Sequence, residues 1–212
     1  MSTRDFRRKP PETTAYVLDV LPYGDPIRRI NHPLVQCIGE EKLILMELRP
    51  LVSTPPMLKP GEKINLMDSL ESQILSFERV IKYSDLSSTA RNNLRDVLVM
   101  LVREHDKRFV DFFNRAQPLS KRTHELELLK GIGKKTLWKI LEERRKKPFE
   151  SFEDIEKRIG IDPVKLIVER VIEELKEPQT RYLFVRPLRW YTPEEERWRE
   201  GRWQRGRGFS AA

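Results

Sequence analysis

The sequence predicts an α+β fold in which an N-terminal small β-barrel is followed by an all-α domain of helical hairpins. Three observations carry this prediction. Short apolar segments separated by glycine and proline fill residues 15–83, a pattern typical of small closed barrels. Apolar residues spaced by three and four follow over residues 86–116 and indicate a long amphipathic helix. A Gly-Ile-Gly turn between two amphipathic stretches then lies at residues 131–133.

The N-terminal half begins with a basic arm, residues 1–14, which we expect to be disordered. Five strands are expected next, over residues 15–21, 34–38, 42–48, 64–66 and 74–83. The Lys-Pro-Gly-Glu-Lys step before the fourth strand is similar to a step in OB-fold barrels, so the barrel is expected to be OB-like. Such barrels bind single strands through aromatic and basic side chains, and the candidates here are Tyr16, Tyr23, Arg28, Arg29, Lys42 and Arg49. The alternative is that the tyrosines pack in the core.

A bridging helix is expected within residues 84–117. Ser84 or Asp85 is suited to cap its start, and Gln117-Pro118 ends it. His105 lies on the apolar stripe, where a hydrogen-bonded core histidine is the expected role.

The Gly-Ile-Gly turn is the most informative stretch of the chain. Its two glycines permit a sharp turn and a close backbone approach, and the helix that starts near Lys134 offers unpaired amides for a phosphate. The pattern resembles the helix-hairpin-helix motif, which implies a grip on a nucleic-acid backbone. The expected phosphate-binding residues are Gly131, Ile132, Gly133, Lys134, Lys135 and Lys139, with auxiliary contacts from Lys130, Arg144 and Arg145. The alternative is an ordinary glycine turn between two bundle helices.

The rest of residues 118–176 is expected to complete a pair of hairpins. Ser151 with Asp154 predicts one helix start, and Asp162 with Pro163 predicts another. A shift of 27 residues aligns Gly133 with Gly160 and predicts a degenerate second hairpin that mainly packs.

Residues 177–212 form an Arg- and Trp-rich extension. Residues 182–185 are expected to be a strand that returns to the barrel. The last ten residues are typical of tails that bind RNA through charge and stacking, with Arg202, Trp203, Arg205 and Arg207 as auxiliary nucleic-acid contacts. A tail docked on the protein body is the alternative.

Charge and composition narrow the class of function. The formal net charge is +8, with ten Lys and Arg against five Glu in residues 118–150, which favours a polyanionic partner. The single cysteine, Cys37, excludes an internal disulfide and a cysteine zinc cluster. No apolar run reaches the ~20 residues that span a bilayer, and no Walker loop or Gly-x-Ser-x-Gly elbow is present. We therefore expect a cytoplasmic, non-enzymatic protein without catalytic residues, metal or cofactor and without a membrane partner.

Residues 16–21, 43–50 and 128–141, together with the order of barrel, helix, hairpins and basic tail, resemble an archaeal family known as domain of unknown function 655. The resemblance covers roughly residues 10–190 and implies a nucleotide- or nucleic-acid-binding protein. Sequence-nonspecific binding of RNA or structured DNA is the expected function, with RNA and DNA both open. The rival is a protein-interaction adaptor of a translation or DNA-repair complex, whose protein partner docks on the Trp-rich tail.

Overall fold

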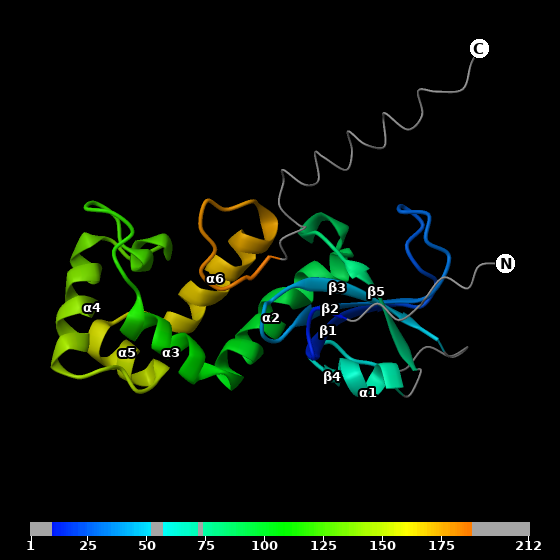
Figure 1. The fold of residues 1–212 in the computed structure, drawn as a ribbon, viewed down its shortest axis with the longest axis horizontal. Coiled ribbons are helices and arrows are strands. Elements are labelled where there is room, and N and C mark those ends of the chain that lie inside the picture. Colours follow the sequence, from blue (N-terminus) through cyan, green and yellow to red (C-terminus); the bar gives the residue numbers. More distant parts are fainter. Residues whose placement is uncertain (1–9, 52–56, 72–73, 188–212) are drawn as a thin grey trace, which may run out of the picture.

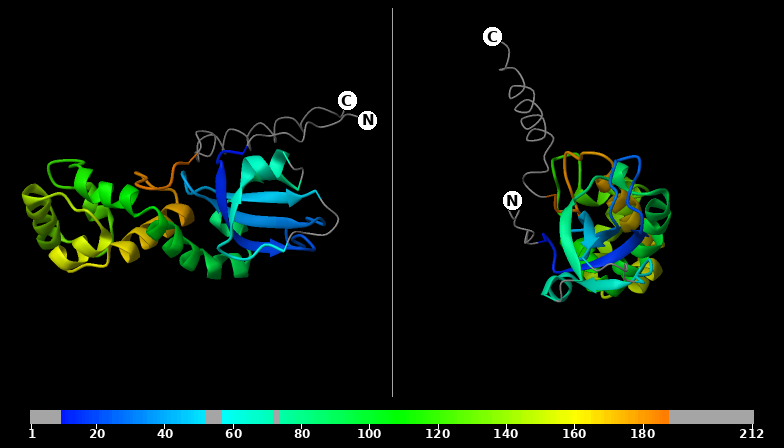
Figure 2. Two further views of the ribbon diagram at one scale, coloured as in Figure 1. Left: turned by 90° about the horizontal axis from the view of Figure 1, so that it is seen from below. Right: turned by 90° about the vertical axis from the view of Figure 1, so that its right-hand side faces the viewer.

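The computed structural model describes residues 10–51, 57–71 and 74–187, with an antiparallel sheet at one end and a helical part at the other (Figures 1 and 2). The strands are β1 (Thr14–Leu21), β2 (Leu34–Gly39), β3 (Leu45–Pro50), β4 (Lys63–Asn65) and β5 (Leu75–Val80). The helices are α1 (Leu66–Glu71), α2 (Ser88–Glu104), α3 (Asp106–Arg115), α4 (Lys134–Lys146), α5 (Phe152–Ile159) and α6 (Pro163–Lys176). Two 3₁₀ turns, η1 (Tyr83–Asp85) and η2 (Glu125–Leu128), complete the described elements. None of the described helices has both the length and the apolar character needed to cross a membrane.

The sheet is open, so the closed barrel expected from the sequence is wrong. Its strand order is β4-β1-β2-β3-β5, and the edge strands β4 and β5 do not pair with each other in the described residues. β4 stops after three residues because Asn65 starts a helix: its side-chain oxygen accepts hydrogen bonds from the amides of Met67 (3.0 Å) and Asp68 (3.3 Å). The short helix α1 therefore stands between the two edge strands.

The two faces of the sheet bury different cores, because successive strand side chains point to opposite faces. One face packs into a small core of its own, which includes Val17 and the fully buried Cys37. The other face carries Tyr16, Leu18, Ile38 and Leu45, and these belong to a core that continues without interruption through α2 and α3 into the hairpins. The helical part and the sheet therefore share one hydrophobic core.

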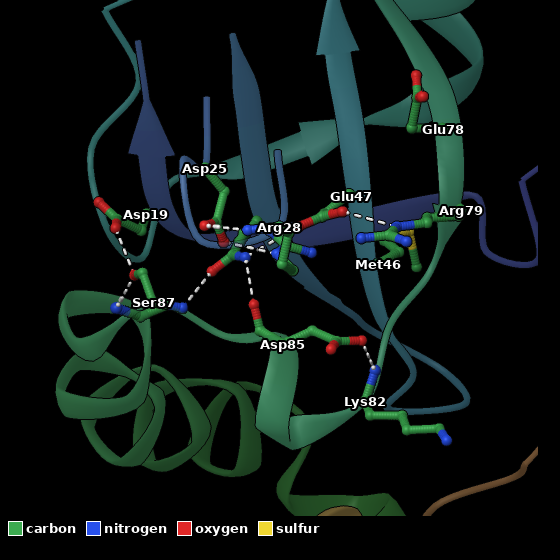
Figure 3. Close-up of polar contacts among 12 residues, drawn as sticks. Asp19, Asp25, Arg28, Met46, Glu47, Glu78, Arg79, Lys82, Asp85 and Ser87 are labelled. Carbon is green, nitrogen blue, oxygen red and sulfur yellow. Dashed lines mark hydrogen bonds and ion pairs between the residues drawn. The ribbon is translucent and has the colours of Figure 1, made fainter. Parts of the chain in front are cut away.

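A buried polar network fastens the sheet to the start of α2 (Figure 3). At its centre the fully buried Glu47 accepts hydrogen bonds from Arg28 (2.5 Å) and Arg79 (3.0 Å). A third bond comes from the amide of Gln36 (2.9 Å), whose oxygen accepts the backbone N–H of Ser87 (2.9 Å). A buried charge is tolerable only when it is paired and hydrogen-bonded, so this network fixes α2 against the sheet.

The bridging helix differs from its prediction at its start and in its middle. Its N-cap is Ser87, whose hydroxyl accepts the N–H of Ala90 at 2.9 Å, rather than Ser84 or Asp85. The expected single helix is broken into α2 and α3 at His105, which has φ −114° and ψ 37°. The half-buried imidazole of His105 leaves the apolar stripe and lies 2.7 Å from a carboxylate oxygen of Glu40, so a contact with the β2–β3 connection accompanies the break.

The hairpin region keeps the predicted helix starts but not the first predicted helix. Ser151 accepts the N–H of Asp154 (3.2 Å), and Asp162 accepts the N–H of Lys165 (3.0 Å), so both caps are confirmed. The first arm of the Gly-Ile-Gly hairpin is only the 3₁₀ turn η2. The residues before it form a turn closed by a bridge between Pro118 and His124, so the first hairpin is asymmetric.

Residues 182–185 do not form the predicted strand; they are held by a buried carboxylate of α6. Glu174 is 3% exposed and accepts the backbone N–H groups of Leu183 (2.6 Å), Phe184 (3.0 Å) and Val185 (2.8 Å). The side chain of Arg170 donates a further bond to it at 2.8 Å. The segment thus reaches the sheet without joining it by strand pairing.

Candidate nucleic-acid interface

The Gly-Ile-Gly hairpin presents the start of α4 at the end of the molecule farthest from the sheet (Figure 1). Gly131 has φ +106°, a conformation open mainly to glycine. Ile132 is buried and holds the turn on the core. Gly133 is the N-cap of α4, and a Cβ built on it would have no neighbour within 4 Å. The first amides of α4 therefore lie next to open space, at the positive end of the helix dipole.

A reciprocal capping arrangement holds the backbone just before the turn. His124 is 5% exposed, and its Nδ1 accepts the N–H of Leu126 at 3.2 Å. Glu127 accepts the backbone N–H of His124 at 2.8 Å. Burial lowers the pKa of His124, with a further lowering from the nearby Arg144 cation. The neutral imidazole is thus the form that fits the site.

Most of the predicted cations already have partners within the protein. Lys134 contacts Glu127 (2.6 Å) and the carbonyl oxygen of Arg122 (2.6 Å), and Lys130 is paired with Glu173. Lys139 donates to the carbonyl oxygen of Ile159 at 2.8 Å, and Arg144 donates to those of Phe113 (2.9 Å) and Ala116 (3.0 Å).

Two predicted cations are placed differently. Lys135 and Arg145 are exposed and make no hydrogen bond or ion pair with any described residue. Of the predicted set, these two side chains are therefore the most available to a phosphate. The four tail candidates Arg202, Trp203, Arg205 and Arg207 lie outside the described residues.

The sequence-based prediction missed Trp138, the most exposed large aromatic of the helical part. The indole lies one turn into α4 with 68% of its surface exposed, and it makes no hydrogen bond or ring contact with the described residues. A helical wheel contains the signal: Leu137 and Ile140 mark the buried face of α4, and Trp138 falls outside it.

The second hairpin matches the first, but with a different register from the expected one. Gly160 has φ +85° and stands three residues before α6, as Gly131 stands three residues before α4. The turns therefore align at a shift of 29 residues rather than 27, which places Asp162 opposite Gly133. The shift of 27 aligned buried apolar positions instead of helix starts. At the second hairpin, the Asp162 carboxylate accepts the first-turn amide of Lys165 itself.

The nucleic-acid contacts predicted on the sheet also divide into side chains that are buried or paired and side chains that are exposed. Tyr16 is buried and donates to Glu104 at 2.6 Å, so it packs. Tyr23 is 88% exposed. Arg28 is held by Asp25 and Glu47. The sheet thus offers fewer available groups than the sequence indicates.

A second polar group lies at the break between α2 and α3. A carboxylate oxygen of Glu40, one of Glu104 and a ring nitrogen of His105 all lie within 4.8 Å of one another, close enough to be considered as metal ligands. The Lys63 ammonium contacts both carboxylates, at 2.6 Å from Glu40 and 2.8 Å from Glu104. These ion pairs supply the positive charge that the two carboxylates require. We therefore interpret these side chains as a structural ion-pair cluster that connects β4, the β2–β3 connection and the end of α2.

Comparison with known proteins covers nearly all of the described chain. A family model described as "Protein of unknown function (DUF655)" matches residues 11–186. The uncharacterized protein MJ0038 of Methanocaldococcus jannaschii is 42% identical over 177 residues, which cover 82% of this chain and 80% of that protein. The crystal structure of Af1531 from Archaeoglobus fulgidus, assigned to the same family model, aligns with a TM-score of 0.70 at 39% identity, covering 82% of this chain and 100% of that chain. The hairpins, α4 and the sheet all lie inside the matched region.

Proposed function

This chain belongs to the family of proteins of unknown function numbered 655, and from that premise we propose that it binds nucleic acid, without catalysis, by holding backbone phosphates at the Gly-Ile-Gly hairpin. The observation that carries the proposal is the open space over Gly133 at the start of α4, beside Lys135. Backbone amides and a helix N-terminus favour an anion at such a place, and Lys135, which pairs with no described residue, adds charge.

Contacts to phosphate do not read base identity. Binding is therefore expected to be largely independent of sequence. A net charge of +8 supports a polyanionic partner. RNA and DNA offer the same phosphate chemistry to the hairpin, so both remain ligands in this proposal.

Two finer structural assignments belong to the same proposal. We assign the paired hairpins to the helix-hairpin-helix type, which is supported by the matching positive-φ glycines before α4 and α6. We assign the sheet to an open OB-like type. Its strand order, with β1 between β2 and β4 and with β5 beside β3, supports this assignment.

The test is a fluorescence-anisotropy titration of the full chain against single-stranded and duplex RNA and DNA at several salt concentrations. Lys135→Glu is the decisive variant, because Lys135 has no described partner whose loss would disturb the fold. We expect it to weaken binding about tenfold or more and to reduce the slope of log affinity against log salt by about one to two.

The matched control is Lys165→Glu, the same charge reversal in the first turn of α6 at the second hairpin. The Asp162 carboxylate already places a negative charge at that helix start and accepts the amide of Lys165, so a change below about twofold is expected. Equal losses in the two variants would mean that only net charge matters. An absence of salt-dependent binding in the parent protein would remove the proposal and favour the adaptor.

A further inference from the structure

We propose that Trp138 is a stacking platform for an unpaired base, so that the ligand of this protein includes single-stranded nucleic acid next to the phosphate held at the hairpin. The inference rests on the proposed function and deepens it. It concerns a side chain that belongs neither to the proposed phosphate site at the Gly-Ile-Gly hairpin nor to the hydrophobic core.

The first step is the exposure of Trp138. Leu137 and Ile140 turn to the core, whereas 68% of the Trp138 surface remains exposed. A large aromatic that contributes this little to packing leaves a flat apolar face available to a ligand.

The second step is the charge around the indole. Residues three and four apart on a helix are neighbours, so Lys134 and Lys135 lie on one side of Trp138 along α4. Arg145 lies two turns beyond it on the same face. Lys135 and Arg145 have no described partner. Both are therefore available to the phosphates on either side of a stacked base.

The nearby acid does not cancel this charge. Glu142 stands four residues after Trp138, but its carboxylate is 3.0 Å from the Lys146 ammonium. An aromatic flanked by lysines differs from the core of a protein–protein interface, where lysine is depleted. It matches the combination of stacking and backbone charge found in single-strand binding sites. Charge complementarity therefore selects a nucleic acid over a protein as the occupant.

The third step decides between paired and unpaired bases. In a duplex, each base face is covered by its neighbours, so a side chain stacks only on a base that has left the stack. Trp138 lies about 6 Å along the helix axis from Lys134, which is near enough for one strand to reach both the hairpin and the indole. A single strand, or a single-stranded region beside a duplex, satisfies this geometry. RNA and DNA share the chemistry.

The experiment compares the parent chain with Trp138→Ala and Trp138→Phe in anisotropy titrations. The ligands are a 12-nucleotide RNA, the DNA strand of the same sequence, its duplex, and an abasic strand of equal length. The exposure of Trp138 predicts that both variants fold, which circular dichroism checks. Trp138→Ala is expected to weaken single-strand binding roughly 5- to 150-fold and to leave the salt slope unchanged, because no charge is removed. Trp138→Phe restores most of the loss.

On the duplex and on the abasic strand, Trp138→Ala is expected to bind as the parent does, within about twofold. Equal single-strand affinity of the parent and Trp138→Ala, or an equal loss on duplex and single strand, would overturn the stacking role. The proposed function would still stand in that case if Lys135→Glu lost affinity. Failure of the parent to bind any of the four ligands would overturn both.

Discussion

At the scale of single residues, the two hairpin glycines have different physical roles. Gly131 is required by its backbone, because φ +106° is rarely open to a residue with a Cβ, and the Cβ would meet Leu166 at 3.4 Å. Gly133 has φ −87°, which any residue adopts. Its missing side chain therefore matters only to a ligand that approaches the backbone there. The first glycine serves the fold, and the second serves the proposed site.

Gly131→Ala should therefore destabilise the protein by about 1–3 kcal/mol. Gly133→Ala should change the free energy of unfolding by less than about 1 kcal/mol, the scale of an N-cap effect, yet weaken nucleic-acid binding. Urea denaturation and anisotropy titration of the two variants separate these effects. If Gly133→Ala binds nucleic acid like the parent, the open space over Gly133 is not the phosphate site.

Glu47 makes a second residue-scale prediction, this time about pH. Burial alone would raise its pKa, but the hydrogen bonds from Arg28, Gln36 and Arg79 hold the pKa below the ordinary value of 4.5. A carboxylate with a depressed pKa stabilises the folded state above pH 4.5, and the contribution is lost as pH falls through the folded-state pKa.

We expect Glu47→Gln to cost about 3 kcal/mol at pH 7, because it leaves Arg28 and Arg79 beside a neutral group. The difference between variant and parent should shrink as the pH falls below 4.5. Urea denaturation between pH 3 and pH 7 measures it. A difference that is independent of pH would show that packing, and not charge, carries the effect.

At the scale of elements, a few polar side chains decide where helices end and segments dock. Asn65 ends β4, His105 separates α2 from α3, and Glu174 holds the segment that follows α6. Each acts through hydrogen bonds to partners that a hydrophobic pattern does not contain.

Glu174→Gln is expected to release the segment around residues 181–187, because an amide cannot replace a carboxylate that accepts three N–H groups and an arginine. The loss should be about 3 kcal/mol. Limited proteolysis near Arg181 should speed up in this variant. The neighbouring Glu173→Gln is the control, since Glu173 is partly exposed and pairs with Lys130 at the surface. Equal cleavage of both variants would contradict the role of Glu174.

These same elements explain what the sequence does and does not predict. Strand positions, both hairpin helix starts and the α+β class follow from local patterns, since alternation and caps are local. The break at His105 comes with a contact to Glu40, 65 residues away, and the anchor at Glu174 depends on N–H groups 9 to 11 residues away. The open sheet follows from the Asn65 side chain, whose bonds are local but lie outside the apolar pattern. The phosphate candidates divide for the same reason: sequence identifies Lys134 and Lys135 equally, whereas Glu127 pairs only with Lys134.

At the scale of the whole molecule, one core joins parts that the sequence divides into separate domains. The core runs from Tyr16 and Leu45 on the sheet, through Leu98, to Ile140 in the first hairpin. A sheet isolated from its helices would expose one entire apolar face. The sheet and the helical part are therefore expected to unfold together, in one cooperative transition.

Calorimetry should accordingly give a single transition, with calorimetric and van't Hoff enthalpies in agreement. A fragment ending at residue 83 should not fold, because it lacks α2 and α3. Two separate transitions, or a folded fragment with dispersed amide resonances, would show that the sheet is an independent domain.

The fully buried Cys37 is a natural reporter of how often the sheet opens. It is the only thiol of the sequence, and burial raises its pKa, so neither access nor thiolate is available while β2 is in place. A disulfide reagent therefore modifies one site, and only after the sheet opens. Its rate of reaction measures how often that happens under native conditions, without denaturant and without an engineered label.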